Sequence, residues 1–197
     1  MKFSDVKVSS RGEIDLTKMM QSGHPVAWLS KLCWEITEAM VCLDPNPVAR
    51  VYKSMNCAIT AWHMHDWIWQ FSDDQMKSEL ARHLNVQKFK SMQDFSRAIQ
   101  KACPAISLCR QVGTAVKHVS VAYNRPDVTT RVVHSDQDGI ISYSVLIVDG
   151  ETEHLDIAVY SAAFEVWSRI YVHLEFPLWE QVYALWPQWQ EMENSKS

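Results

Sequence analysis

Apolar residues recur at steps of three and four along most of the chain, which is the spacing of amphipathic helices. The first such stretch begins at Pro25 and ends at Leu43, before a run of Asp44-Pro45-Asn46-Pro47 that a helix cannot continue through. Asn46 then suits an N-cap, with Pro47 in the first helical position. The spacing predicts helices over residues 25–43, 47–71, 75–84, 92–103, 105–119, 156–174 and 178–186. We expect Ser72 to cap the third of these.

Two segments between the helices show a different pattern, rich in Val, Ile, Thr and Tyr. Residues 127–135 and 140–148 read as strands, and Asp136-Gln137-Asp138-Gly139 between them is a hairpin turn signal. Asp149-Gly150 marks a second turn, and residues 2–8 suit a short strand or an arm. The predicted fold is α+β and predominantly helical, with about six helices and a two-stranded antiparallel hairpin. We expect one domain over 1–197, with a helical part at 24–121, the hairpin at 127–150 and C-terminal helices at 155–190.

Composition narrows the class of protein further. The chain has 197 residues, 47% of them hydrophobic and 21% charged, and a formal net charge of -4. These values are typical of a soluble globular protein and exclude collagen-like, disordered and strongly basic nucleic-acid coat proteins, although a local basic patch is still compatible with RNA. Five cysteines without a CxxC pair indicate neither a disulfide framework nor a zinc knuckle. With no secretory or membrane-spanning segment expected, the prediction is a cytoplasmic protein.

The densest polar feature is the sequence NCAITAWHMHDWIW at residues 56–69. Steps of four, three and four place Asn56, Thr60, His63 and Trp67 on one helix face, and Asp66 lies one turn from His63. His63 and His65 diverge by about 200° on a helix, so we expect His65 not to join this pair. The pair suits a local hydrogen bond in which Asp66 orients the imidazole. It would form a metal site only with ligands from elsewhere, because no HExxH or ExxH motif is present.

A second polar stripe lies on the helix predicted at 105–119. This stripe follows steps of three and four residues and consists of Arg110, Thr114, Lys117 and His118. On the same helix, Gly113 leaves room for another helix to approach closely. Facing the first stripe, the four polar residues would form a cationic pocket with acid–base capacity. The alternative is that Arg110 and Lys117 are solvated charges and that His118 interacts with the helix C-terminus.

The segments NCAITAWHMHDWIW and CPAISLCRQVGTAVKH, in this order, resemble an uncharacterised bacterial helical family with AWHxxDW and CPxxxLCRxxxxxxKH segments. The likeness covers roughly residues 50–170. More distantly, a charged helix ending in Lys-His resembles HEPN domains, small helical domains that include metal-independent ribonucleases of defence and toxin systems. Their motif is an Arg, four to six residues and a His, whereas seven residues separate Arg110 from His118 here.

The resemblance implies that the domain binds or cleaves RNA without a metal or cofactor. The catalytic residues would be His63, Asp66, Arg110 and His118. His63 and His118 would exchange protons, and Arg110 and Lys117 would hold the phosphate. Asn56, Thr60 and Thr114 would line the substrate site beside Lys117.

Two other functions remain open from the sequence. The chain has nine tryptophans, and Trp179, Trp186 and Trp189 cluster near the C-terminus, where an exposed patch would bind a protein partner or form a homodimer. Alternatively, His63 and Asp66 would anchor a metal or a small molecule. The common nucleotide-binding and serine-hydrolase motifs are absent from the sequence.

Overall fold

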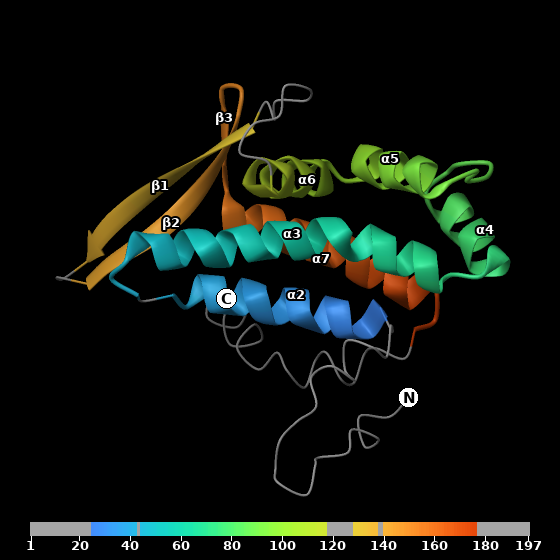
Figure 1. Ribbon diagram of the computed structural model, residues 1–197, viewed down its shortest axis with the longest axis horizontal. Coiled ribbons are helices and arrows are strands. Elements are labelled where there is room, and N and C mark those ends of the chain that lie inside the picture. The colour runs from blue at the N-terminus through green and yellow to red at the C-terminus, as the bar shows by residue number, and fades with distance from the viewer. Residues whose placement is uncertain (1–24, 43, 118–127, 138–139, 177–197) are drawn as a thin grey trace, which may run out of the picture.

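The computed structural model of the protein describes residues 25–42, 44–117, 128–137 and 140–176 (Figure 1). Within them it contains six helices and a three-stranded antiparallel sheet. In chain order the elements are α2 (Pro25–Met40), α3 (Pro47–Phe71), α4 (Asp74–His83), α5 (Met92–Ala102), α6 (Pro104–Lys117), β1 (Val128–Gln137), β2 (Ile140–Asp149), β3 (Thr152–Leu155) and α7 (Asp156–His173). The predominantly helical α+β class predicted from the sequence is therefore confirmed.

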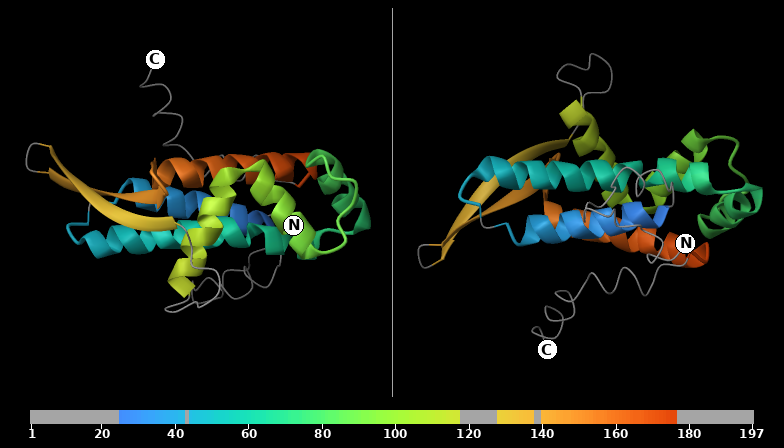
Figure 2. Two further views of the ribbon diagram at one scale, coloured as in Figure 1. Left: turned by 90° about the horizontal axis from the view of Figure 1, so that it is seen from above. Right: turned by 60° about the horizontal axis from the view of Figure 1, so that its bottom comes forward.

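Helix α3 is the centre of the bundle and packs against α2, α6 and α7. Three hydrogen bonds that involve side chains join α3 to α7, each across 106 residues: Arg50 donates to Asp156, the hydroxyls of Ser54 and Tyr160 bind each other, and the Trp167 indole donates to the Ala61 carbonyl. This constant offset means that the two helices run parallel and in register. The sheet lies at the end of the bundle where α3 and α7 begin (Figures 1 and 2).

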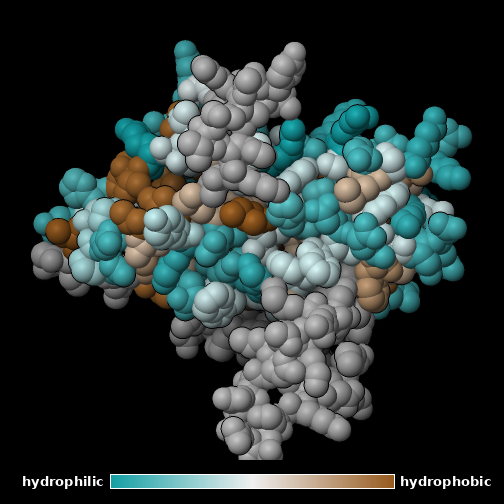
Figure 3. Space-filling model, viewed as in Figure 1, coloured by the Kyte–Doolittle hydropathy of each residue, from teal (hydrophilic) through white to brown (hydrophobic). Residues whose placement is uncertain are grey.

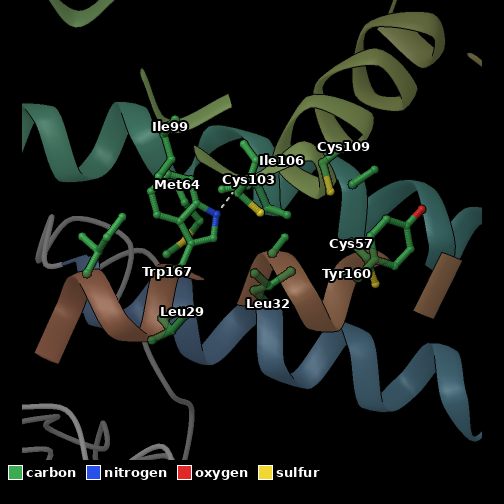
Figure 4. Close-up of a cluster of buried hydrophobic side chains, with 14 of the residues drawn as sticks. Leu29, Leu32, Cys57, Met64, Ile99, Cys103, Ile106, Cys109, Tyr160 and Trp167 are labelled. Atoms are coloured by element: carbon green, nitrogen blue, oxygen red, sulfur yellow. Dashed lines mark hydrogen bonds between the residues drawn. The ribbon is translucent and has the colours of Figure 1, made fainter. Parts of the chain in front are cut away.

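The core fills the space between these helices with large apolar side chains. Trp167 is fully buried, and its indole Nε1 donates a hydrogen bond to the carbonyl oxygen of Ala61 at 2.9 Å (Figure 4). All five cysteines are unpaired and buried, which places them in the core as small apolar groups. Burial raises the pKa of Cys33 to about 12, and it raises the pKa of Cys57 and of Cys109 as well.

Two buried polar contacts interrupt this core near the start of α3. Arg50 Nη2 donates to Asp156 Oδ1 at 2.7 Å, and the two side chains are 4% and 0% exposed. One turn further on, the hydroxyls of Ser54 and Tyr160 are 2.8 Å apart. Together these four residues fasten the N-terminal halves of α3 and α7 to each other.

Local signals explain where most helices begin and end. Asn46 caps α3 by accepting a hydrogen bond from the Val48 N–H, with Pro47 as the first helical residue, as expected. The cap expected at Ser72 is wrong by one residue, because Asp73 accepts from the Met76 N–H and caps α4. Ser72 instead donates its hydroxyl to the carbonyl of Ile68 at 2.6 Å and so ends α3.

The sheet has three strands where the sequence predicted two. β1 and β2 pair without a bulge from Val128 opposite Asp149 to Gln137 opposite Ile140. After a turn at Gly150, which has a positive φ of 59°, β3 pairs with the other edge of β2. Its sequence TEHL lacks an alternating apolar pattern, so only the turn signal at Gly150 pointed towards a second hairpin.

Two predicted elements, the strand or arm at 2–8 and the helix at 178–186, lie outside the described residues. Among the helices that the structure describes, none has the length and apolarity needed to cross a bilayer.

Candidate functional site

The outward side of α3 carries the candidate site. Val48, Tyr52, Asn56 and Gln70 are exposed at helical intervals, and His63 is partly exposed between them. Helix α2 flanks this side below and α6 flanks it above in the view of Figure 1. The exposed face of α3 is therefore a strip bounded by two further helices, each of which can add side chains to it.

At the middle of this strip, His63 and Asp66 form the hydrogen bond that the sequence predicts. His63 Nδ1 lies 2.7 Å from Asp66 Oδ2, and the side chains are 42% and 33% exposed. With the Nδ1 proton donated to the carboxylate, the neutral imidazole keeps a lone pair on Nε2. This arrangement leaves His63 able to take a proton from a bound molecule.

His65 does reach Asp66, so the expectation that it stays apart is wrong. Its Nε2 lies 3.2 Å from Asp66 Oδ1, and its Nδ1 lies 2.6 Å from the Trp62 carbonyl oxygen. The expectation compared the directions of His63 and His65 around the helix, whereas Asp66 lies next to His65 and offers it a second oxygen. The His65 ring packs against Trp62 with centroids 4.1 Å apart and the ring planes tilted by 37°.

The buried position of His65 sets its protonation. Burial lowers the pKa of His65 below its ordinary value of 6.5, while the hydrogen bond to Trp62 and the charge of Asp66 act in the opposite direction. His65 is therefore neutral near neutral pH, and it donates its one N–H to the Trp62 carbonyl, so its Nε2 contacts Asp66 without donating a hydrogen bond. His63 is the more exposed imidazole of the two and the one placed to meet a ligand.

Helix α6 brings Arg110 to the same strip. The guanidinium carbon of Arg110 lies 5.9 Å from the centroid of the Trp62 ring, and Nη1 donates to Gln100 Oε1 at 3.3 Å. This partner is a neutral amide, so it does not neutralise the charge of the exposed guanidinium. The approach of α6 centres on Gly113, where an added Cβ would lie 3.6 Å from Ile59 Cα.

The buried polar residue of the α3 stripe, Thr60, contacts helix α2 rather than α6. Thr60 is buried, and its hydroxyl accepts a hydrogen bond from Lys31 Nζ at 2.5 Å. Lys31 also forms an ion pair with Glu35. Next to them Trp67 stacks on Trp28 of α2 with centroids 4.6 Å apart.

Sequence reasoning missed Lys31, because a lysine on an amphipathic helix resembles any solvated charge. The available signal was its spacing. Lys31 lies one turn after Trp28 and one turn before Glu35, on a helix with few other charges. In the structure its ammonium lies 5.7 Å from the Trp28 ring, so Lys31 borders the strip on the side opposite Arg110.

The predicted site is thus assembled in part. The structure brings His63, Asp66 and Arg110 to one strip around Trp62, and Asn56 is exposed further along it. Thr60 is turned towards α2, and Thr114 is half-buried on α6. Lys117 ends α6, but its side chain and all of His118 lie outside the described residues, as do Trp179, Trp186 and Trp189.

The metal hypothesis finds no support in the described part of the chain, where no three His, Cys, Asp or Glu side chains converge as metal ligands. Comparisons with models of protein families, with curated proteins and with solved structures find no match to this chain. The resemblance to HEPN domains therefore stays a prediction, and the function has to be argued from the site itself.

Proposed function

We propose that the exposed face of α3 binds single-stranded RNA and cleaves it by metal-independent acid–base chemistry. The observation that carries the proposal is the His63–Asp66 hydrogen bond of 2.7 Å on a partly exposed helix face. A histidine oriented by a carboxylate is a general base whose working range includes neutral pH. On one side of it Arg110 supplies positive charge in a chain of net charge -4, and on the other side lies Lys31, in its ion pair with Glu35.

The proposed reaction is an internal transfer at phosphorus. The RNA 2′-hydroxyl attacks the adjacent phosphate, and its proton moves to His63 Nε2 while the new 2′-oxygen–phosphorus bond forms. The bond from phosphorus to the 5′-oxygen breaks, and that oxygen takes a proton from the same imidazolium or from His118. The products are a 2′,3′-cyclic phosphate and a 5′-hydroxyl end. Arg110 stabilises the charge that develops on the phosphate oxygens.

Tryptophans beside the dyad fit the single-stranded form of the substrate. Trp28, Trp62 and Trp67 are partly exposed on α2 and α3, where Trp28 stacks on Trp67 and Trp62 packs against His65, so a base would stack on the part of each ring that remains exposed. Unpaired bases stack on such rings, and each stacked base contributes about 1–3 kcal/mol to binding. Because Arg110 would contact phosphate, affinity should fall with salt at a slope of about −0.7 per phosphate contacted.

The proposal is tested by incubating the purified full chain with an end-labelled single-stranded RNA in the presence of EDTA. We expect cleavage to a cyclic phosphate, and a rate about 10²–10⁴ lower for His63→Gln, in line with the loss of a general base. Asp66→Asn and Arg110→Gln should each reduce the rate as well.

The matched control for Arg110→Gln is Arg169→Gln, which removes the same charge from an exposed position on α7. This control should cleave like the parent chain. Cleavage that survives in His63→Gln, or that falls equally in Arg169→Gln, would reject the proposed roles and point to a contaminating nuclease.

A further inference from the structure

The outer edge of β1 is open to pairing. The strand order is β1-β2-β3, so within the described residues β1 has a neighbour on one side only. The strand is ten residues long, pairs with β2 without a bulge and contains neither proline nor lysine. Bulges, prolines and lysines are features by which proteins usually protect an exposed strand edge from pairing. The edge does carry two charged residues, Arg131 and Asp136, but Arg131 forms an ion pair with Glu153 of β3, so the backbone of β1 is suited to receive another strand.

Beside this edge lies an apolar groove between the hairpin and the start of α3. It has a volume of about 360 Å³ and is lined by Pro47, Val48, Val51, Val132, Val133, His134 and Tyr143. Of these residues, Val48 and Val132 are 46% and 39% exposed. Hydrophobic side chains gather at this end of the molecule in Figure 3. An apolar surface next to an open edge indicates a protein partner.

We propose that this partner is a second copy of the chain, which pairs its β1 antiparallel with this β1 about a two-fold axis through Val133. The result is one six-stranded sheet across the dimer, formed from two three-stranded sheets. In this register Val133 faces its own copy, Arg131 faces Ser135 and Thr130 faces Asp136. Like charges are kept apart, and each charged side chain meets a polar one.

Symmetry and charge select this register among the alternatives. Residues that lie opposite each other in a sheet point to the same face, and a two-fold axis perpendicular to the sheet keeps every side chain on its own face. Such an axis must therefore pass midway between one residue and its own copy on the other strand, and we name the axis by that residue. Axes through Arg131 or Asp136 would oppose like charges, which is destabilising. An axis through Val132 would set Asp136 against Val128, which is buried at 3% exposure. The axis through Val133 avoids both problems and overlaps residues 129–137 of both strands, whereas axes through His134 or Ser135 overlap only residues 131–137 or 133–137.

A disulfide scan of the outer face of β1 tests the pairing directly, because the five native thiols are buried and leave little background. We expect Val133→Cys to form a cross-linked dimer under mild oxidation, since only this position faces itself. The matched controls Arg131→Cys and Ser135→Cys should not cross-link singly, whereas the variant carrying both should. Light scattering should give twice the chain mass of 22.8 kDa.

Val133→Arg supplies a second readout, because it would oppose two like charges at the axis while remaining on the outer face. We expect this variant to be monomeric with an unchanged circular dichroism spectrum. A monomeric parent chain, or cross-linking that is equal at positions 131, 133 and 135, would overturn the proposal. Neither result depends on RNA cleavage, because the pairing lies at the hairpin and the proposed reaction lies at His63.

Discussion

Helix α3 carries two polar clusters that differ in burial and, we infer, in purpose. Arg50 and Ser54, near its start, are buried and bind Asp156 and Tyr160 of α7. His63 and Asp66, in its middle, bind each other and remain 42% and 33% exposed. Each cluster contains a charged carboxylate partner at 2.7 Å, so distance alone does not distinguish them.

The two clusters differ in whether their polar atoms can reach solvent or a ligand. In the buried cluster, Arg50 Nη1 and Asp156 Oδ2 have no hydrogen-bond partner among the described residues, so the pair is sealed and depends on its own geometry. Such pairs hold elements in register. The half-exposed cluster offers an imidazole nitrogen to solvent and to ligands. Similar residue types thus stabilise the fold in one place and, in our proposal, form the reactive surface in the other.

The largest expected effect comes from breaking the buried pair. Asp156→Asn leaves the Arg50 guanidinium buried without its counter-ion, which costs about 3–5 kcal/mol of the free energy of unfolding. Urea denaturation followed by circular dichroism measures it. Replacing both partners, as Arg50→Met with Asp156→Leu, should cost clearly less than either single change. A loss below about 1 kcal/mol in Asp156→Asn would mean that the pair does not hold α3 to α7.

A smaller loss is expected from Tyr160→Phe. It removes the hydroxyl bonded to Ser54 and leaves that buried serine without this partner, so the free energy of unfolding should fall by about 1–3 kcal/mol. Ser54→Ala with Tyr160→Phe removes both hydroxyls and should restore part of the loss. The same denaturation curves, in a double-mutant cycle, give the coupling energy. A coupling near zero would contradict the structural role of this contact.

The exposed cluster should behave in the opposite way. His63→Gln is expected to change the free energy of unfolding by no more than about 0.5 kcal/mol, as is usual for surface positions, while lowering the rate of RNA cleavage by about 10²–10⁴. Thermal melting and the cleavage assay on one preparation give both values. If His63→Gln unfolded the protein as strongly as Asp156→Asn, the contrast between the two clusters would disappear.

Stability should also depend on pH through the histidines. The pKa of His65 is lowered by burial, and the pKa of His83 is lowered by burial and by the nearby His173. The unfolded chain therefore binds protons more readily than the folded one, and stability is lost as the pH falls below 6.5. His65→Asn keeps a donor for the Trp62 carbonyl and removes the titration, so its stability should fall less steeply in that range. Equal slopes in the parent and the variant would contradict the assignment.

A gain in stability is expected at the contact of α3 with α6. Gly113→Ala adds a Cβ at an ordinary contact distance of 3.6 Å from Ile59, and alanine is the better helix former. The variant should be more stable by about 0.5–1 kcal/mol, as thermal melting would show. A destabilised variant would indicate that the helices approach more closely than the structure describes.

Much of the fold could be predicted because its signals are local. Asn46 with Pro47, and Cys103 with Pro104, mark helix boundaries in the sequence, and apolar spacing marks the helices between them. The His63–Asp66 bond was predictable because both residues lie on one turn. The Arg50–Asp156 pair joins positions 106 residues apart, and no pattern in the sequence around either residue predicts it. The contact of Lys31 with Thr60 likewise needed the packing of α2 on α3.

The central claim, that the exposed strip of α3 is the functional site, is tested most directly by the indole N–H signals of the tryptophans in an NMR titration with single-stranded RNA. We expect the signals of Trp62 and Trp67 to shift saturably, because these rings border His63. The signal of Trp167, whose N–H is bound to Ala61 in the core, should stay in place and serves as the internal reference. Signals that all remain unmoved, or a shift confined to the exposed Trp34 on α2, would contradict the account.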